Sequence, residues 1–290
     1  MRVNKMKNRF ALKIAYLGWN YQGFQRQKES IETIEGTLIT TLENLGIITE
    51  KIPKRYTAAG RTDRGVHALS QVIAFDTPKK EIYLEEINQH LPSDIFAWGI
   101  AKVKETFHAR RDAIKRTYKM FYPYSNENID IIKQALDQFK GTHDFIKLSK
   151  RSDILPSGQK KSTILTIDQA EVDFKENLNI LEFTFTSKSF LWHQVRKMVS
   201  LILDIGTNKY AIDMVSEVLN PKSNLPKGGI KPVAPDGLIL YNVEYQKISF
   251  KKIERKALIE SKIIKELIKH TSRKSILQLM KESILNNDKQ

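Results

Sequence analysis

The chain has 290 residues, 41% of them hydrophobic, so it can bury a substantial core in one large domain or two ordinary ones. Lysine and arginine number 48 against 33 acidic residues, and the net charge of +15 favours a polyanionic partner such as nucleic acid over a merely basic protein. Cysteine is absent, which excludes disulfides, thiolate catalysis and cysteine-bound metal centres. No apolar run approaches about 20 residues and no signal-peptide pattern is present, so a cytoplasmic protein without a membrane span is expected.

The first part of the chain predicts the element order β-α-β-β-α-β. Its helices show apolar residues at helical spacing, and its strands are apolar and partly β-branched. In chain order we expect a strand at Phe10–Leu17, a helix capped by Ser30 with apolar positions from Ile31 to Leu45, a short strand before Gly60, a strand at Gln71–Phe75, a helix at Tyr83–His90 and a strand at Ile95–Val103.

The same order of elements recurs in the second part of the chain, without a repeat of the residues themselves. We expect strands at Arg116–Tyr122, Ile164–Phe174, Leu178–Thr186 and Leu238–Tyr245, with helices at Ile129–Phe139 and Phe190–Ile205. Two ferredoxin-like (RRM-like) halves with antiparallel sheets, at residues 1–105 and 106–250, would satisfy this order. The sequence therefore predicts the α+β class.

Residues 251–290 differ from the rest in charge and pattern. They carry eleven basic and five acidic residues, and their apolar positions fit amphipathic helices. We expect a basic, helical C-terminal extension. Two interpretations stay open: an appendage packed on the body of the protein, or an RNA-binding extension.

The segment with the most chemical content runs from Ala58 to Ala68 and reads Ala-Ala-Gly-Arg-Thr-Asp-Arg-Gly-Val-His-Ala. Gly60 and Gly65 bracket a charged core between two strand-like segments, where glycine allows positive φ or a close approach of another backbone. An ordinary hairpin turn would explain Asp63, Arg64 and Gly65 equally well. The glycine patterns of nucleotide-binding loops are absent from the sequence.

This segment resembles the Gly-Arg-Thr-Asp-x-Gly-Val-His-Ala signature of the TruA-like pseudouridine synthases. The match is nine residues long and specific. In that family the aspartate is the nucleophile, and the arginine two residues before it contacts the RNA near the flipped nucleotide. The resemblance implies these roles for Asp63 and Arg61.

Other segments resemble the same family in the same order, over roughly residues 8–246. In that family the tyrosine of the Arg-Thr-Tyr motif contacts the target uracil, and the arginine of the late helix pairs with the catalytic aspartate, which implies Tyr118 and Arg196. The matching segments are Gly23–Gln27, Phe107–Arg110, Arg116–Tyr118, Gly141–Phe145, Phe190–Arg196 and Ala234–Leu238.

The resemblance implies a pseudouridine synthase fold, catalytic roles for Asp63, Tyr118 and Arg196, and no cofactor or metal. It also implies tRNA as partner, with target uridines in the anticodon stem-loop around positions 38 to 40. We expect RNA contacts from Arg61, His67, Gln25, Arg110, Arg116 and His193.

Two departures from the bacterial pattern stand out. Arg64 occupies a position where many bacterial members have alanine, and the sequence Trp-His-Gln-Val-Arg at 192–196 is closer to the archaeal and eukaryotic branch. Both departures affect the expected target nucleotides rather than the reaction.

Pseudouridine formation breaks the N1–C1′ bond of uridine and joins C5 to C1′, and it is redox-neutral. An ionised carboxylate can attack either C1′ or C6 of the base, and the sequence leaves this choice open. A synthase acting on other RNA positions and a non-catalytic RNA-binding protein are the competing interpretations. A metal-dependent nuclease is weaker, because clustered carboxylates are not found in the sequence. A homodimer is left open.

Overall fold

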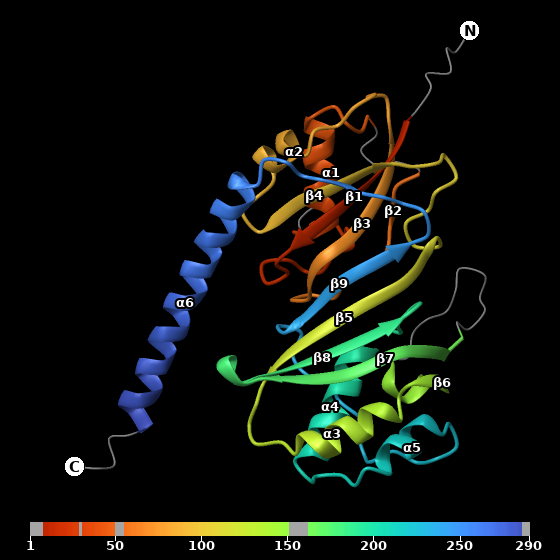
Figure 1. The fold of residues 1–290 in the computed structure, drawn as a ribbon, viewed down its shortest axis with the longest axis vertical. Helices are drawn as coiled ribbons and strands as arrows, with labels where there is room; N and C mark the ends of the chain where they lie inside the picture. Colours follow the sequence, from red (N-terminus) through yellow and green to blue (C-terminus); the bar gives the residue numbers. More distant parts are fainter. Residues whose placement is uncertain (1–7, 29–30, 50–54, 151–161, 286–290) are drawn as a thin grey trace.

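A computed structural model describes residues 8–28, 31–49, 55–150 and 162–285 (Figure 1). The first half packs two helices against a set of strands. Its elements are β1 (Asn8–Tyr16), α1 (Ile34–Asn44), β2 (Thr57–Ala58), β3 (His67–Thr77), α2 (Leu84–His90) and β4 (Ile95–Lys102). The predicted cap Ser30 lies outside the described residues. Thr33 caps α1 instead, since its hydroxyl accepts a hydrogen bond from the Gly36 amide.

The second half begins at β5 and ends at β9. Its elements are β5 (Ala113–Pro123), α3 (Ile129–Asp137), β6 (Gly141–Asp144), the 3-10 turn η1 (Ile146–Leu148), β7 (Ile164–Lys175), the 3-10 turn η2 (Glu176–Leu178), β8 (Ile180–Ser187), α4 (Gln194–Gly206), α5 (Met214–Leu219) and β9 (Leu238–Tyr245). The sequence prediction missed β6 and α5, which are both short. The helix expected from Phe190 begins only at Gln194.

All these strands join one continuous sheet, which unites the sheets expected for the two halves. A last short strand, β10 (Lys251–Lys252), lies at its edge, and the order is β10-β4-β1-β3-β9-β5-β8-β7-β6, with β2 paired to β3. The two halves join where β9 runs parallel to the start of β3, at His67 and Ala68, while its other edge pairs antiparallel with β5. Ile239 and Leu240 of β9 are therefore paired on both edges, which joins the two halves into one sheet.

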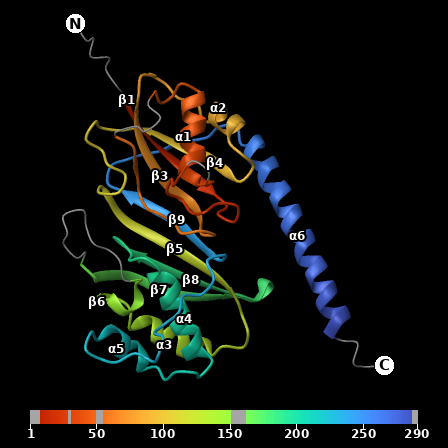
Figure 2. The ribbon, with the colours of Figure 1, turned by 180° about the vertical axis from the view of Figure 1, so that it is seen from behind.

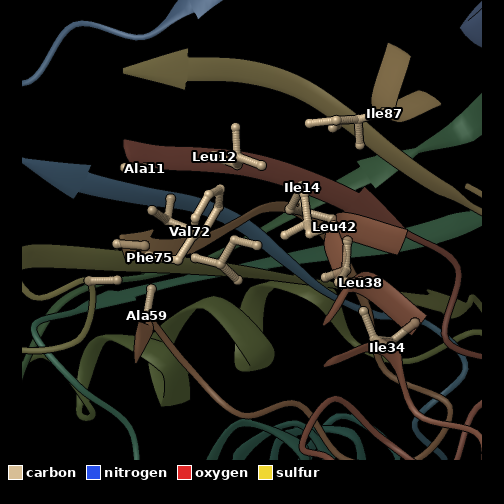
Figure 3. Close-up of a cluster of buried hydrophobic side chains, with 14 of the residues drawn as sticks. Ala11, Leu12, Ile14, Ile34, Leu38, Leu42, Ala59, Val72, Phe75 and Ile87 are labelled. Atoms are coloured by element: carbon tan, nitrogen blue, oxygen red, sulfur yellow. The ribbon is translucent and has the colours of Figure 1, made fainter. Parts of the chain in front are cut away.

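Each half has its own core. In the first, Leu38 and Leu42 of α1 lie with Leu12 and Ile14 of β1 and with Val72 of β3 (Figure 3). In the second, buried side chains of α3 and α4 pack against β7 and β8. The buried Phe75, Phe183 and Phe185 each remove a large apolar surface from water. The residues that meet at the junction are therefore carried by two well-packed bodies.

After β10, the described part of the C-terminal extension forms the helix α6 (Ala257–Leu285). It starts beside α2 and runs past the level of β9 and β5, standing apart from the second half in both views (Figures 1 and 2). Ile268 and Leu277 are more than 60% exposed, so the amphipathic pattern does not pack on the body there. None of the helices within the described ranges is long and apolar enough to span a membrane.

Candidate active site

Asp63 lies in the loop of residues 60–66, here named the Asp63 loop, which leads into β3. At its start, the buried Gln71 side chain holds both backbone groups of Gly60, at 3.2 Å from the amide and 2.9 Å from the carbonyl. At its end, the Val66 amide donates to the Asp63 carbonyl at 3.1 Å. Gly65 has φ +81°, which glycine adopts at little cost. The turn chemistry considered from the sequence is therefore present in the loop that carries the aspartate.

A second loop supports the Asp63 loop from the side of β1. The Phe24 amide donates to the Thr62 carbonyl at 3.0 Å, and the Tyr16 hydroxyl lies 2.7 Å from the Thr62 hydroxyl. A Cβ atom on Gly18 would lie 2.2 Å from the Val66 carbonyl oxygen, so only glycine permits this approach. The segment around Gly23–Gln27 therefore supports the backbone next to Asp63, although it is distant in sequence.

The Asp63 carboxylate faces two basic side chains from the start of α4. Its Oδ2 atom lies 3.4 Å from Nε2 of His193 and 3.9 Å from Nη1 of Arg196. His193 adopts φ +65° directly before the helix, a conformation uncommon for residues other than glycine. The Asp63 side chain keeps 32% of its surface exposed, so a substrate can still reach it. Sequence reasoning gave His193 an RNA-binding role and missed its proximity to Asp63.

Arg196 is held in place by the chain that follows α5. Its Nε donates to the Val233 carbonyl at 2.7 Å, and the Val233 amide donates to the Arg196 carbonyl at 3.3 Å. At 3.9 Å the contact with Asp63 is a single ion pair, longer than a hydrogen bond. Burial lowers the pKa of Arg196 from its ordinary value, while Asp63 and Asp236 oppose that shift. The guanidinium stays charged at neutral pH, because arginine is effectively always protonated in proteins.

Tyr118 lies on β5 opposite Leu240 of β9 and Phe185 of β8, at the junction of the two halves. The ring of Phe190 meets its ring edge-on at a centroid distance of 5.3 Å. Burial raises the pKa of Tyr118 to about 12, which the nearby Arg116 opposes and Asp63 reinforces. The phenol is therefore neutral at physiological pH, so it can donate a hydrogen bond or stack but cannot serve as a phenolate base.

Two of the predicted RNA-binding residues have their polar atoms engaged inside the protein. The Arg116 guanidinium donates to the carbonyls of Ala59, Arg110 and Lys188. His67 accepts from the Gly18 amide on Nδ1 at 3.0 Å, so its Nε2 carries the proton donated to the Asp236 carbonyl at 2.9 Å. Both side chains are buried, and their hydrogen bonds connect loops of the two halves.

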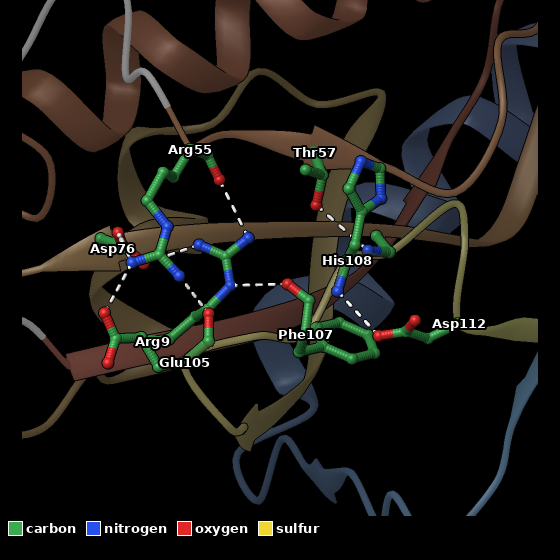
Figure 4. A network of polar contacts seen from close by, with 9 residues as sticks. Arg9, Arg55, Thr57, Asp76, Glu105, Phe107, His108 and Asp112 are labelled. Atoms are coloured by element: carbon green, nitrogen blue, oxygen red, sulfur yellow. Dashed lines mark hydrogen bonds and ion pairs between the residues drawn. The ribbon is translucent and has the colours of Figure 1, made fainter.

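Arg61, Gln25 and Arg110 instead have exposed side chains. The backbone that presents Arg110 is firmly held, as Figure 4 shows for the neighbouring residues. Arg9 donates to the Phe107 carbonyl at 2.8 Å and to Asp76 at 2.6 Å, and the Ala109 amide donates to Thr57 at 3.1 Å. These three side chains are therefore open to solvent, unlike those of His67 and Arg116.

Within the described ranges, no three histidine, aspartate or glutamate side chains gather as a metal site. The Asp63 carboxylate therefore lies opposite His193 and Arg196 and near the neutral phenol of Tyr118.

Comparison with known proteins places the chain in a family. The family model described as tRNA pseudouridine synthase matches residues 135–246. A protein named tRNA pseudouridine synthase A from Methanosphaera stadtmanae is 38% identical over 251 residues, covering 85% of this chain and 87% of that protein. Another of that name, from Pyrococcus furiosus, is 34% identical over 280 residues, covering 97% and 98%. The chain belongs to the tRNA pseudouridine synthase family, whose members are isomerases.

Proposed function

We propose that this protein converts uridine to pseudouridine in tRNA, with Asp63 as the nucleophile. The observation that carries the proposal is the Asp63 carboxylate held 3.9 Å from Arg196 at the junction of the two halves. The names of its archaeal relatives, together with the net charge of +15, support tRNA as the substrate.

The reaction requires the N1–C1′ bond to break, the base to turn, and a C5–C1′ bond to form, with the proton at C5 lost and one gained at N1. Asp63 supplies the nucleophile at C1′ or C6 of the uridine. Tyr118, neutral and packed edge-on against Phe190, supplies a ring face and a hydrogen-bond donor for the extruded uracil. Arg61, Gln25 and Arg110 contact the RNA, while His67 and Arg116 position the loops.

We further propose that both halves are ferredoxin-like. The first pairs its strands in the order β4-β1-β3-β2 and the second in the order β9-β5-β8-β7. In each half the fourth strand therefore lies beside the first, the first beside the third, and the third beside the second. The shared order supports a common architecture, with β6 and β10 added at the edges of the sheet.

A non-catalytic RNA-binding protein is the second candidate, because one sheet face of the second half is open and carries the exposed Tyr241 and Phe121. Such a protein would not need an aspartate that faces a half-buried arginine. The site geometry therefore favours the enzyme.

We expect the modified uridines to lie in the anticodon stem-loop, around positions 38 to 40. The test is to incubate the purified protein with unmodified tRNA, without added cofactor, and to map pseudouridine chemically. Modification confined to the T-arm or D-arm would show that the predicted target is wrong while the proposed reaction holds. Binding without any pseudouridine would favour the non-catalytic protein.

We also expect the far part of α6 to contribute to tRNA binding. Arg273, Lys274 and Lys281 lie with Leu277 on the face of this helix that also carries His270. Replacing all three basic residues by alanine should weaken tRNA affinity and reduce the slope of log affinity against log salt by about 2 to 3. Point variants are preferable to cutting the chain after residue 250, which would also remove β10 and the buried Ile253.

The matched control replaces Lys140, Lys175 and Lys209 by alanine, which removes the same charge from the second half. Each of these lysines is paired with an acidic residue of its own surface. An equal loss of affinity and slope in both triple variants would show that α6 acts only through the total charge of the protein.

A further inference from the structure

The first part of α6 is fixed to the body by polar contacts at the end of α2. The Lys262 ammonium donates to the carbonyls of Asn88 at 2.7 Å, Leu91 at 2.8 Å and Pro92 at 3.3 Å. The last carbonyls of a helix have no partner within the helix, so a cation that binds them stabilises the helix end. One turn further along α6, Glu266 accepts from the Ser93 hydroxyl at 3.3 Å. These contacts of Lys262 and Glu266 fix the position of the next turn of α6.

The next turn of α6 places an aromatic ring against the loop that supports the active site. His270 lies 3.5 Å from Glu266, and its ring centroid is 4.2 Å from that of Trp19. Trp19 in turn meets His67 edge-on, with centroids 4.5 Å apart. The rings of His270, Trp19 and His67 therefore form one continuous set of contacts from α6 to the interior.

His67 is bonded on both ring nitrogens, so a shift of its ring would disturb two other segments. Its Nδ1 accepts a hydrogen bond from the backbone amide of Gly18, a residue that packs closely against the Val66 carbonyl. Its Nε2 donates to the backbone carbonyl of Asp236. Asp236 follows Pro235, which fills the space beside Gly65. Val66 and Gly65 both belong to the Asp63 loop. The contacts of His270, Trp19 and His67 thus extend to the backbone of the loop that carries Asp63.

The loop that bears Trp19 is anchored on its other side by the segment that α6 contacts. The Asp94 carboxylate accepts hydrogen bonds from the side-chain amide of Asn20 at 3.0 Å and from the Tyr21 hydroxyl at 2.7 Å. The Asp94 backbone carbonyl accepts from the backbone amide of Leu17 at 2.9 Å. Asp94 directly follows Ser93, the partner of Glu266. The helix, this loop and the Asp63 loop therefore form one connected unit.

We infer that α6 positions the Asp63 loop through the contact of His270 with Trp19, so that both are positioning residues for the reaction. The inference rests on the proposed function and goes beyond it, because it gives the near part of α6 a role in the rate of the chemical step. Arg273, Lys274 and Lys281, further along the helix, serve RNA affinity instead.

The test measures pseudouridine formation in a single turnover at saturating unmodified tRNA, with the tRNA dissociation constant measured separately. His270→Ala should lower the maximal rate roughly two- to tenfold, the range expected from one aromatic contact, while tRNA affinity stays within about twofold. His270→Phe keeps a ring against Trp19 and should restore most of the rate. Ile268→Ala, which removes an exposed side chain from the opposite side of the same helix, should keep the full rate.

A double variant tests whether the two residues act through each other. His270→Ala combined with Trp19→Ala should be no slower than Trp19→Ala alone, because the contact is already lost. Additive losses, an unchanged rate in His270→Ala, or weaker tRNA binding at an unchanged rate would each overturn the inference. Failure of the unaltered protein to form pseudouridine would instead refute the proposed function.

Discussion

Asp63→Asn should abolish pseudouridine formation while leaving tRNA binding largely intact. The substitution preserves the size of the side chain and removes the carboxylate that acts as nucleophile. The Asp63 loop should keep its conformation, because its hydrogen bonds at Gly60, Thr62 and Val66 do not use the Asp63 side chain. Turnover is measured under single-turnover conditions, and binding by titration of labelled tRNA.

A matched substitution elsewhere separates loss of the nucleophile from loss of a negative charge. Asp213→Asn alters a carboxylate at the start of α5 in the second half and should retain the rate of the unaltered protein. Full activity in Asp63→Asn would remove Asp63 from the mechanism. Loss of tRNA binding together with turnover would show that Asp63 acts in folding or recognition.

Arg196→Ala should lower the rate roughly 10- to 100-fold, the range expected when a charged hydrogen-bonding partner is removed. Two effects combine, because Asp63 loses its nearest permanent cation and the Val233 carbonyl loses its donor. Arg196→Lys should recover only part of the rate, since one ammonium cannot replace both the Nε bond to Val233 and the Nη1 contact with Asp63.

Lys209→Ala is the control for Arg196, because it removes a positive charge from beyond the far end of α4. It should leave the rate unchanged. An Arg196→Lys variant as active as the unaltered protein would show that only the charge is needed. An Arg196→Ala variant with the full rate would remove the pair from the mechanism.

The order of strands and helices could be predicted from the sequence because each long element has a clear apolar period. The short elements β6 and α5 could not, since four to six residues hold too little pattern. The start of α4 was misplaced because Phe190, Leu191 and Trp192 extend the apolar run before the helix, whereas the backbone turns at His193 with φ +65°.

The candidate site was predicted mainly from its resemblance to a family. The contact between Asp63 and Arg196 follows from that resemblance, but the hold of Val233 on Arg196 and the position of His193 depend on how the two halves meet. Burial of His67 and Arg116 was missed, because a basic side chain in a motif gives no sign of whether its donors are engaged by carbonyls.

The contacts between α6 and the body of the protein could not be predicted from the sequence. Its apolar residues predicted an amphipathic helix, yet Ile264 and Leu267 stay exposed while polar residues such as Lys262 and Glu266 make the contacts with the body. Nothing in the pattern around His270 indicates Trp19 as a neighbour, since about 250 residues of chain separate them.

The most direct test of the central claim is a nucleoside analysis of unmodified tRNA after incubation with either the unaltered protein or Asp63→Asn, without nucleotide or redox cofactor. The account predicts conversion of uridine to pseudouridine by the unaltered protein and none by the variant at equal tRNA occupancy. No pseudouridine from the unaltered protein, or equal amounts from both, would contradict it.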